Sequence, residues 1–183
     1  TPSWIAAVPR PLAPEWTSYR RRVQYQTYDV TGRLHPGENA VGALVGEGWY
    51  AGRLMVAGRF AYGTFPRFLL QLEIELADGR TQTVVTDESW RSTTHGPIRS
   101  SGLYDGEVYE ARQEMPGWDA PGFNDREWNR VQVFQRGPEQ LVWQPNEPIR
   151  VMKELTPVAL TQPQPGVHIF DFGQNLGGWC RLT

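Results

Sequence analysis

Aromatic side chains that could contact a ligand occupy a short glycine-rich segment, GEGWYAG, at residues 46–52. Glycine tolerates unusual backbone dihedrals, so the rings of Trp49 and Tyr50 can project from a loop here. A ring face beside a polar group suits a sugar, because sugars present apolar C–H faces and peripheral hydroxyls. Alternatively, Trp49 closes the end of a hydrophobic core, and the sequence is compatible with both interpretations.

Carboxylates gather in a second segment, GPIRSSGLYDGEVYEAR, at residues 96–112. A glycosidase-type acid and base need two carboxyl groups roughly 5 to 9.5 Å apart across one cleft. If residues 107–112 form a strand, Glu107 and Glu110 point to opposite faces of it, because side chains alternate along a strand. This spacing argues against a catalytic pair, and we expect ion pairs with Arg99 or Arg112 instead.

Asp105 and Glu107 also offer oxygen ligands that a hard cation such as calcium prefers. The spacing matches no known calcium loop, so the sequence assigns no metal ligand. The three histidines lack metal-ligand spacing, and the chain contains no GxSxG elbow, GxGxxG fingerprint or P-loop lysine. A self-contained hydrolase or metalloenzyme is therefore not expected, and no cofactor is required.

The overall composition restricts the classes of partner. The chain has 183 residues and a net charge of -2. Binding to a nucleic acid backbone needs clustered Lys and Arg, and Arg20–Arg22 is the only such run. No apolar stretch approaches the roughly 20 residues of a membrane helix. We therefore expect a soluble chain with no nucleic acid and no membrane partner, and cytoplasmic rather than secreted.

The elements that must position these side chains are short strands. Period-two alternation at residues 67–76, an Asp-Gly pair at 78–79 and a β-branched run at 81–86 predict a hairpin. Further strands are predicted at 22–30, 40–45, 89–93, 107–113, 130–134, 149–155, 167–172 and 178–182. Regular spacing with turn residues between the strands predicts an all-β antiparallel sandwich with very little helix.

The positions of proline and glycine suggest the domain organisation. Residues 1–14 are predicted to be an extended lead-in, and residues 15–160 a β-sandwich module with a surface loop at 135–148. The string TQPQPG at 161–166 reads as a linker. Residues 167–183 then begin another apolar unit, which we expect to be the truncated start of a following β-domain.

Several strings in unbroken order resemble one family. They are EWTSYRRRVQYQTYDVT, GENAVGALVGEGWYAG, DESWRSTTHGPIRSSGLYDGEVYEAR, GWDAPGFNDREW and FDFGQNLGGW. Together they resemble the amino-terminal region of bacterial α-L-rhamnosidases of glycoside hydrolase family 78, over residues 15–134 and 167–182. Five ordered matches make this resemblance far more specific than any single string.

The resemblance implies a jelly-roll β-sandwich, similar to galactose-binding-like modules, ahead of an (α/α)6-barrel catalytic domain in the same protein. That barrel would remove terminal α-L-rhamnose with inversion, using one carboxylic acid and one carboxylate. The family's acidic catalytic motifs belong to the barrel, and no segment here resembles them. The resemblance therefore implies a non-catalytic portion that supports or shapes the catalytic cleft.

Two further hypotheses remain open. Some family members are thought to bind rhamnose with calcium through a related module, which would make this chain an autonomous carbohydrate-binding module. Trp49, Tyr50, Asp105 and Glu107 would then be the sugar contacts. The chain could also hydrolyse glycosides itself, with Asp105 paired with Glu107 or Asp171.

The strand pattern also predicts which side chains are buried. Leu70, Leu72 and Ile74 share one face of the strand at 67–76 and should lie in the core. Leu72→Ala should therefore lower the free energy of unfolding by roughly 2 to 5 kcal/mol, as truncation of a core side chain does. Urea denaturation measures this, and a loss under about 0.5 kcal/mol contradicts the strand register.

Overall fold

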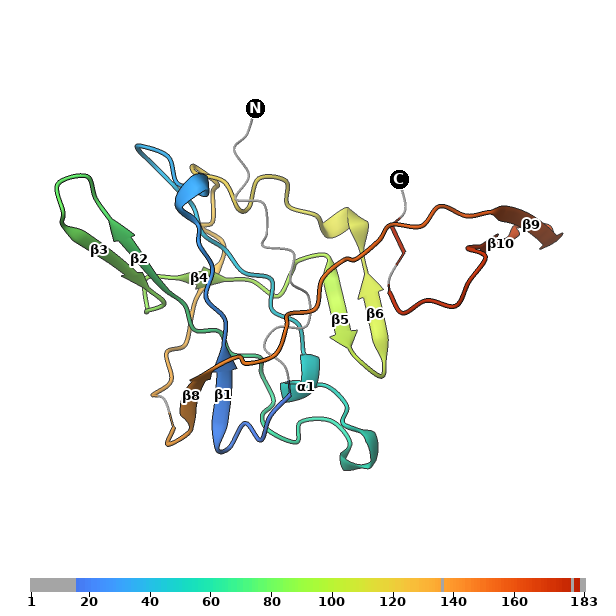
Figure 1. Ribbon diagram of the computed structural model, residues 1–183, viewed down its shortest axis with the longest axis horizontal. Helices are drawn as coiled ribbons and strands as arrows, with labels where there is room; N and C mark the ends of the chain where they lie inside the picture. The colour runs from blue at the N-terminus through green and yellow to red at the C-terminus, as the bar shows by residue number, and fades with distance from the viewer. Residues whose placement is uncertain (1–15, 136, 179, 182–183) are drawn as a thin grey trace. The chain divides into compact units, whose positions relative to one another are not determined.

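The computed structural model describes residues 16–135, 137–178 and 180–181 (Figure 1). Residues 1–14, for which the sequence predicts an extended lead-in, lie outside this described part. The chain divides into two units, Thr1–Ile149 and Arg150–Thr183, and each is described by itself.

The regular secondary structure of the described residues is mostly strand with very little helix, as the spacing of strand and turn signals predicts. The strands are β1 (Arg22–Tyr25), β2 (Gln71–Glu75), β3 (Thr81–Val85), β4 (Arg91–Ser92), β5 (Ile98–Gly102), β6 (Gly106–Tyr109), β7 (Asn129–Arg130), β8 (Gln140–Trp143), β9 (Ala159–Gln164) and β10 (Val167–Asp171). The helical elements are α1 (Gly48–Ala51) and three 3-10 turns, η1 (Thr31–Arg33), η2 (Met55–Ala57) and η3 (Ala111–Gln113). No helix of this part of the chain has the length and apolar character needed to cross a membrane.

The strands pair two by two, so the sheets are small. Four pairs are antiparallel, β2–β3, β4–β7, β5–β6 and β9–β10. The fifth pair, β1–β8, is parallel and joins segments more than a hundred residues apart in the sequence. No jelly roll is resolved among the described residues, because each ladder stops after two strands. The predicted all-β class is confirmed, and the jelly-roll topology is not part of the structure described here.

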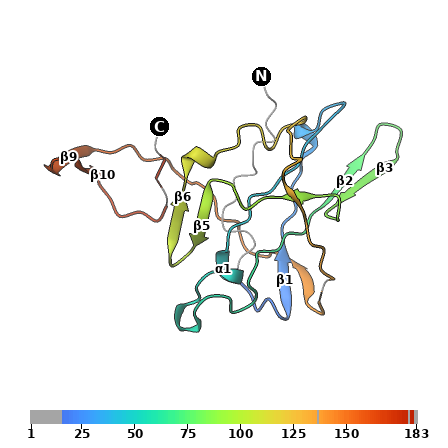
Figure 2. The same ribbon diagram turned by 180° about the vertical axis from the view of Figure 1, so that it is seen from behind.

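The β2–β3 hairpin matches the prediction closely (Figures 1 and 2). Leu72 faces Val84, and burial alternates along β2 from exposed to half-buried side chains. Gly79 adopts a φ of 81° in the turn, a conformation that glycine reaches without steric cost. The amide of Gly79 donates to the carbonyl of Leu76 at 2.9 Å, which closes the turn. Local sequence signals are therefore sufficient for this element.

Several other strand predictions are wrong in extent. The strands predicted at 22–30, 89–93, 107–113 and 130–134 shrink to β1, β4, β6 and β7, and residues 40–45 and 149–155 form no strand. Residues 111–113 leave the strand for η3, where the Glu110 carboxylate accepts a hydrogen bond from the Arg112 amide. Of the strand predicted at 178–182, the described residues 178, 180 and 181 are not strand.

Three strands are present where the sequence predicts none. β5 precedes β6, β8 lies inside the predicted loop at 135–148, and β9 covers most of the predicted linker at 161–166. Pro163 is tolerated in β9 because a two-stranded hairpin leaves one edge of each strand unpaired, where no backbone donor is needed. The domain boundaries themselves stay a prediction.

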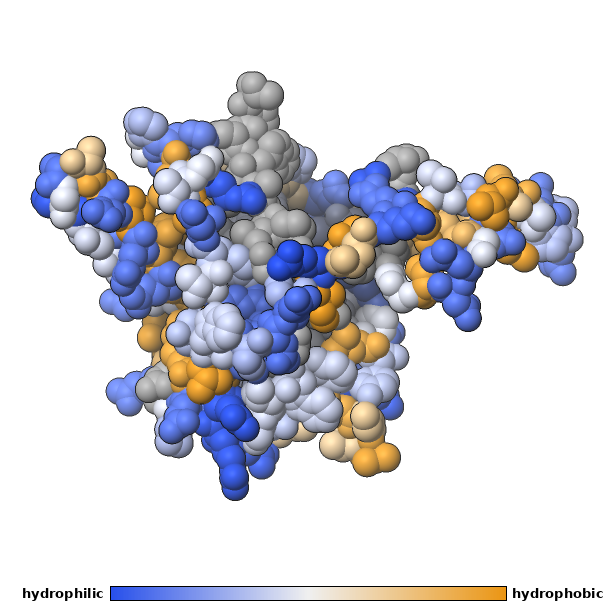
Figure 3. Space-filling model, in the orientation of Figure 1, coloured by the Kyte–Doolittle hydropathy of each residue, from blue (hydrophilic) through white to orange (hydrophobic). Residues whose placement is uncertain are grey.

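The core of the described residues is small. Only Ala51, Gly52, Leu54 and Gln144 are buried among them. Gln144 is satisfied there, since its side-chain oxygen accepts from Gln26 Nε2 and its side-chain Nε2 donates to the Asn146 carbonyl at 3.5 Å. Its backbone N–H donates to the Tyr25 carbonyl at 3.1 Å. Figure 3 shows apolar and polar side chains interspersed over one face of the molecule. Most apolar side chains are therefore half-buried or exposed.

The partial burial of the apolar side chains of β2 lowers the loss of stability expected when one of them is shortened. Leu70, Leu72 and Ile74 are half-buried rather than buried, because β2 pairs with β3 alone. Leu72→Ala is therefore expected to cost about 1 to 2 kcal/mol, at or below the lower end of the range for a core leucine. Glu75→Ala, at an exposed position of the same strand, is the matched control and should stay within about 0.5 kcal/mol of the parent chain.

Candidate functional site

Trp49 lies in the one-turn helix α1 and packs between other aromatic rings. Gly48 opens the helix with a φ of 47°, which favours glycine and confirms that this position needs an unusual backbone. The ring of Trp49 stacks on Trp16 with centroids 5.3 Å apart and meets the edge of Tyr104 at 6.1 Å. These neighbours support the interpretation of Trp49 as a packing residue, and its contact with a sugar stays a prediction.

Tyr50 belongs to a different group of rings. It lies 5.9 Å from Tyr19 and 6.4 Å from Tyr62, measured between ring centroids. Gly63 allows the close approach, since a Cβ added at this position would overlap the Tyr50 ring. The consecutive residues Trp49 and Tyr50 therefore pack on different rings, and a hydrogen bond from Trp16 Nε1 to the Tyr62 hydroxyl at 3.3 Å joins the two groups.

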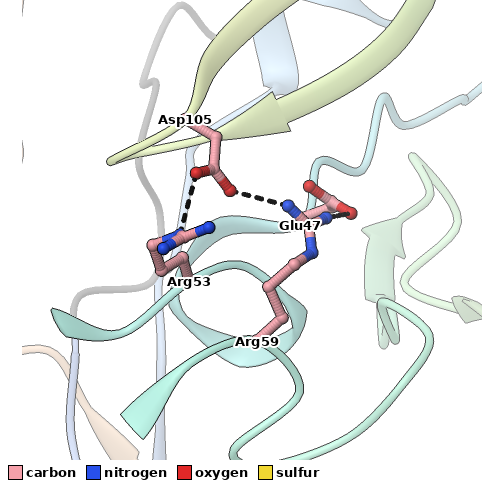
Figure 4. A network of polar contacts seen from close by, with 4 residues as sticks. All are labelled: Glu47, Arg53, Arg59 and Asp105. Carbon is pink, nitrogen blue, oxygen red and sulfur yellow. Dashed lines mark hydrogen bonds and ion pairs between the residues drawn. The ribbon is translucent and has the colours of Figure 1, made fainter. Parts of the chain in front are cut away.

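Asp105 lies at the centre of a charged network (Figure 4). Its Oδ1 accepts a hydrogen bond from Arg53 Nε at 3.0 Å, and its Oδ2 accepts one from Arg59 Nη1 at 2.6 Å. The second terminal nitrogen of Arg59 donates to the Glu47 carboxylate. Both oxygens of Asp105 are thus engaged by guanidinium groups, which come from the loop after α1.

The network anchors the loop that follows α1. Arg53 and Arg59 flank this loop, Leu54 bridges to Gly58 inside it, and the Leu54 side chain is buried. The hydrogen bond with Glu47 is the main cause that raises the pKa of Arg59 above its ordinary value. Residues 55–57, at the tip of the loop, are exposed. The contacts that hold the loop are therefore at its base, where the ion pairs and the buried Leu54 side chain lie.

Glu107 lies on the exposed strand β6, apart from this network. Its side chain forms no hydrogen bond or ion pair with another described residue. Glu110 is paired instead, and Arg112 donates to its two oxygens at 2.6 and 2.7 Å. These bonds hold the pKa of Glu110 below its usual range. The expected pairing within the segment 96–112 is confirmed for Glu110 and Arg112.

The structure therefore brings only part of the predicted site together. Trp49 and Asp105 come near each other through Tyr104, whereas Tyr50 and Glu107 point elsewhere. Sequence reasoning missed Glu47, Arg53 and Arg59, which lie 46 to 58 positions from Asp105 in the chain. The density of glycine at 46–59 was the available signal. Within the described ranges, no three His, Cys, Asp or Glu side chains group as a metal site requires.

The fold and the site define a strand-rich module. Its aromatic rings pack on one another, and the carboxylates of Asp105 and Glu110 pair with arginines. The chain belongs to the alpha-L-rhamnosidase N-terminal domain family, whose model matches residues 8–153. This confirms the family that the ordered sequence strings resemble.

Characterised relatives are much longer than this chain. It is 49% identical over 172 residues to an alpha-L-rhamnosidase of Streptomyces avermitilis, which covers 93% of this chain and 17% of that protein. It is 41% identical over 168 residues to an alpha-L-rhamnosidase of Alteromonas sp. (strain LOR), covering 91% of this chain and 18% of that protein. The chain thus spans less than a fifth of either relative.

Solved structures agree with this assignment. The fold is similar to that of the Streptomyces avermitilis alpha-L-rhamnosidase complexed with L-rhamnose, with a TM-score of 0.81 and 45% identity over 91% of this chain and 16% of that one. It is also similar to the alpha-L-rhamnosidase from Dictyoglumus thermophilum, with a TM-score of 0.80 and 36% identity over 91% of this chain and 18% of that one.

The tyrosine cluster predicts a specific response to alkaline pH. Burial, and next the nearby Tyr62, raise the pKa of Tyr19 from 10.0 to about 12. The folded-state value exceeds the unfolded one, so this contribution to stability is complete below pH 10 and is lost as the pH rises to about 12. The hydrogen bond with Glu114 raises the pKa of Tyr109 as well, so absorbance titration near 295 nm should show two late-ionising tyrosines, and urea midpoints should fall over this window.

Tyr19→Phe should remove one of the late-ionising tyrosines, leave that of Tyr109, and flatten that part of the stability profile. Tyr25→Phe, on the separate strand β1, is the matched control and should leave these features in place. A late phase of unchanged amplitude in Tyr19→Phe would contradict the assignment.

Proposed function

We propose that this chain is the non-catalytic β-sandwich portion of a larger α-L-rhamnosidase, where it supports or shapes the cleft of a catalytic domain. Membership of the alpha-L-rhamnosidase N-terminal domain family supports this proposal. So does the length of the relatives, since 172 aligned residues make up only 17% of the Streptomyces avermitilis protein. The parent would cleave terminal α-L-rhamnose from glycosides with inversion, through two carboxyl groups of an (α/α)6 barrel.

The observation that carries the non-catalytic role is the engagement of Asp105. A general acid needs a raised pKa and a free proton, and a general base needs a free lone pair facing a water. The two oxygens of Asp105 instead accept hydrogen bonds from Arg53 and Arg59. Glu110 is held ionised by Arg112 and is a poor acid at neutral pH. We assign these carboxylates to structure rather than to proton transfer.

The short strand pairs are proposed to be parts of an antiparallel jelly roll similar to galactose-binding-like modules. Residues 15–160 would form this module, and residues 167–183 would begin the next β-domain. The resemblance of the sequence strings and the TM-scores of 0.81 and 0.80 to rhamnosidase structures support this reading.

An autonomous rhamnose-binding module, with or without calcium, is the second candidate. It is favoured by one observation, the similarity to a rhamnosidase structure that holds L-rhamnose. The sugar contacts would be Trp49, Tyr50, Asp105 and Glu107. Against it, Trp49 packs on Trp16 and Asp105 is bound by two arginines.

Hydrolysis of an aryl α-L-rhamnoside by the isolated chain tests the non-catalytic role. We expect no turnover above buffer, because arginines engage Asp105 and Glu110, which leaves Glu107 without a second free carboxylate to complete an acid–base pair. Turnover that disappears in Glu107→Gln would overturn the proposal. Turnover that is the same in Glu107→Gln and in the parent chain leaves the proposal in place.

Calorimetry with L-rhamnose separates the two candidates. We expect no heat of binding at millimolar sugar, with or without calcium. Heat that vanishes in Trp49→Ala, and is kept in the exposed control Trp143→Ala, would instead establish the rhamnose-binding module.

A further inference from the structure

A hollow of about 300 Å³ opens in the first unit, away from the charged network. It is lined by Thr64, Phe65, Arg67, Gln132 and Phe134. The lining comes from two segments, one that leads into β2 and one that follows β7. Its volume is at the lower end of the range for small-molecule sites, so it can take one sugar-sized ring.

Arg67 is the only charged residue of this lining. Its guanidinium carbon lies 4.7 Å from the centroid of the Phe134 ring and 5.8 Å from that of Tyr50. Such contacts hold the planar group by cation–π attraction and leave its N–H donors free in their plane. The Arg67 side chain makes no hydrogen bond or ion pair with another described residue, unlike Arg53, Arg59 and Arg112.

The other polar side chains of the lining are also unengaged. Neither Thr64 nor Gln132 forms a side-chain hydrogen bond within the described chain. The rings of Phe65 and Phe134 are 75% and 50% exposed, so aromatic surface is available beside these polar groups. The hollow thus combines one unpaired cation, one amide, one hydroxyl and two accessible rings, with no acidic residue in its lining.

We infer that this hollow binds a sugar ring that carries a carboxylate, such as a uronic acid residue of a glycan. Arg67 would bind the carboxylate through two parallel N–H bonds, a geometry that an arginine fork and a carboxylate share. Gln132 and Thr64 would bond to ring hydroxyls, and Phe65 would contact an apolar C–H face. The sugar part of this inference rests on the proposed function, whereas the carboxylate part rests on Arg67.

Calorimetric titration of the chain with D-glucuronate, D-glucose and acetate tests the inference. We expect D-glucuronate to bind at least about tenfold more tightly than either of the other two, because only it supplies both a carboxylate and a ring. If D-glucose binds as tightly as D-glucuronate, the carboxylate does not contribute to binding. If acetate binds as tightly as D-glucuronate, the sugar ring does not contribute. No binding of D-glucuronate overturns the inference as a whole.

Variants assign the binding to this hollow. Arg67→Ala should remove the preference for D-glucuronate over D-glucose, and Arg67→Lys should weaken it because the charge stays and the fork is lost. Gln132→Ala, at an exposed polar position, should weaken the binding of D-glucuronate without affecting the fold. Arg21→Ala, an exposed arginine outside the lining, is the matched control and should bind as the parent chain does.

Unchanged D-glucuronate binding in both Arg67→Ala and Gln132→Ala would overturn the assignment, and near-ultraviolet circular dichroism checks that each variant is folded. The readout is independent of the rhamnoside assay. Failure of uronate binding leaves the non-catalytic role intact, and rhamnoside turnover overturns that role without touching the Arg67 site.

Discussion

The pairing of Asp105 with two arginines is the interaction on which the arrangement around α1 depends. It ties the turn between β5 and β6 to both ends of the loop at residues 53–59. Arg59 extends the connection to Glu47, just before α1. Few side chains are buried among the described residues, so directional bonds at the loop base replace part of the packing that a larger core would supply.

The same pairing decides what this region can do chemically. The Asp105 carboxylate accepts one guanidinium hydrogen bond at each oxygen, an arrangement that suits a structural cross-link. Arg67 is the contrasting case. Its guanidinium group lies near the rings of Tyr50 and Phe134 and donates no hydrogen bond to another described residue. Paired charges stabilise the module, and the unpaired cation is where a ligand can supply the missing acceptor.

Local signals explain what the sequence predicts well. The β2–β3 hairpin follows from period-two alternation and an Asp-Gly turn, all within 20 residues. β8 was missed because its partner is β1, far away in the sequence, and its prolines suggested a loop. Similarly, the sequence predicts the pairing of Glu110 with the nearby Arg112, whereas the Asp105 partners Arg53 and Arg59 come from a distant loop. Long-range pairing is set by the fold, and a single sequence does not contain it.

A double-mutant cycle between Asp105 and Arg59 measures whether this ion pair anchors the loop at residues 53–59. The stabilities of Asp105→Asn, Arg59→Gln and the double variant would be compared with the parent chain by urea denaturation. If the ion pair anchors the loop, each single change lowers the midpoint, and the double variant loses less stability than the sum of the two single losses. Additive losses, or single variants as stable as the parent, would show that the pair does not hold the loop.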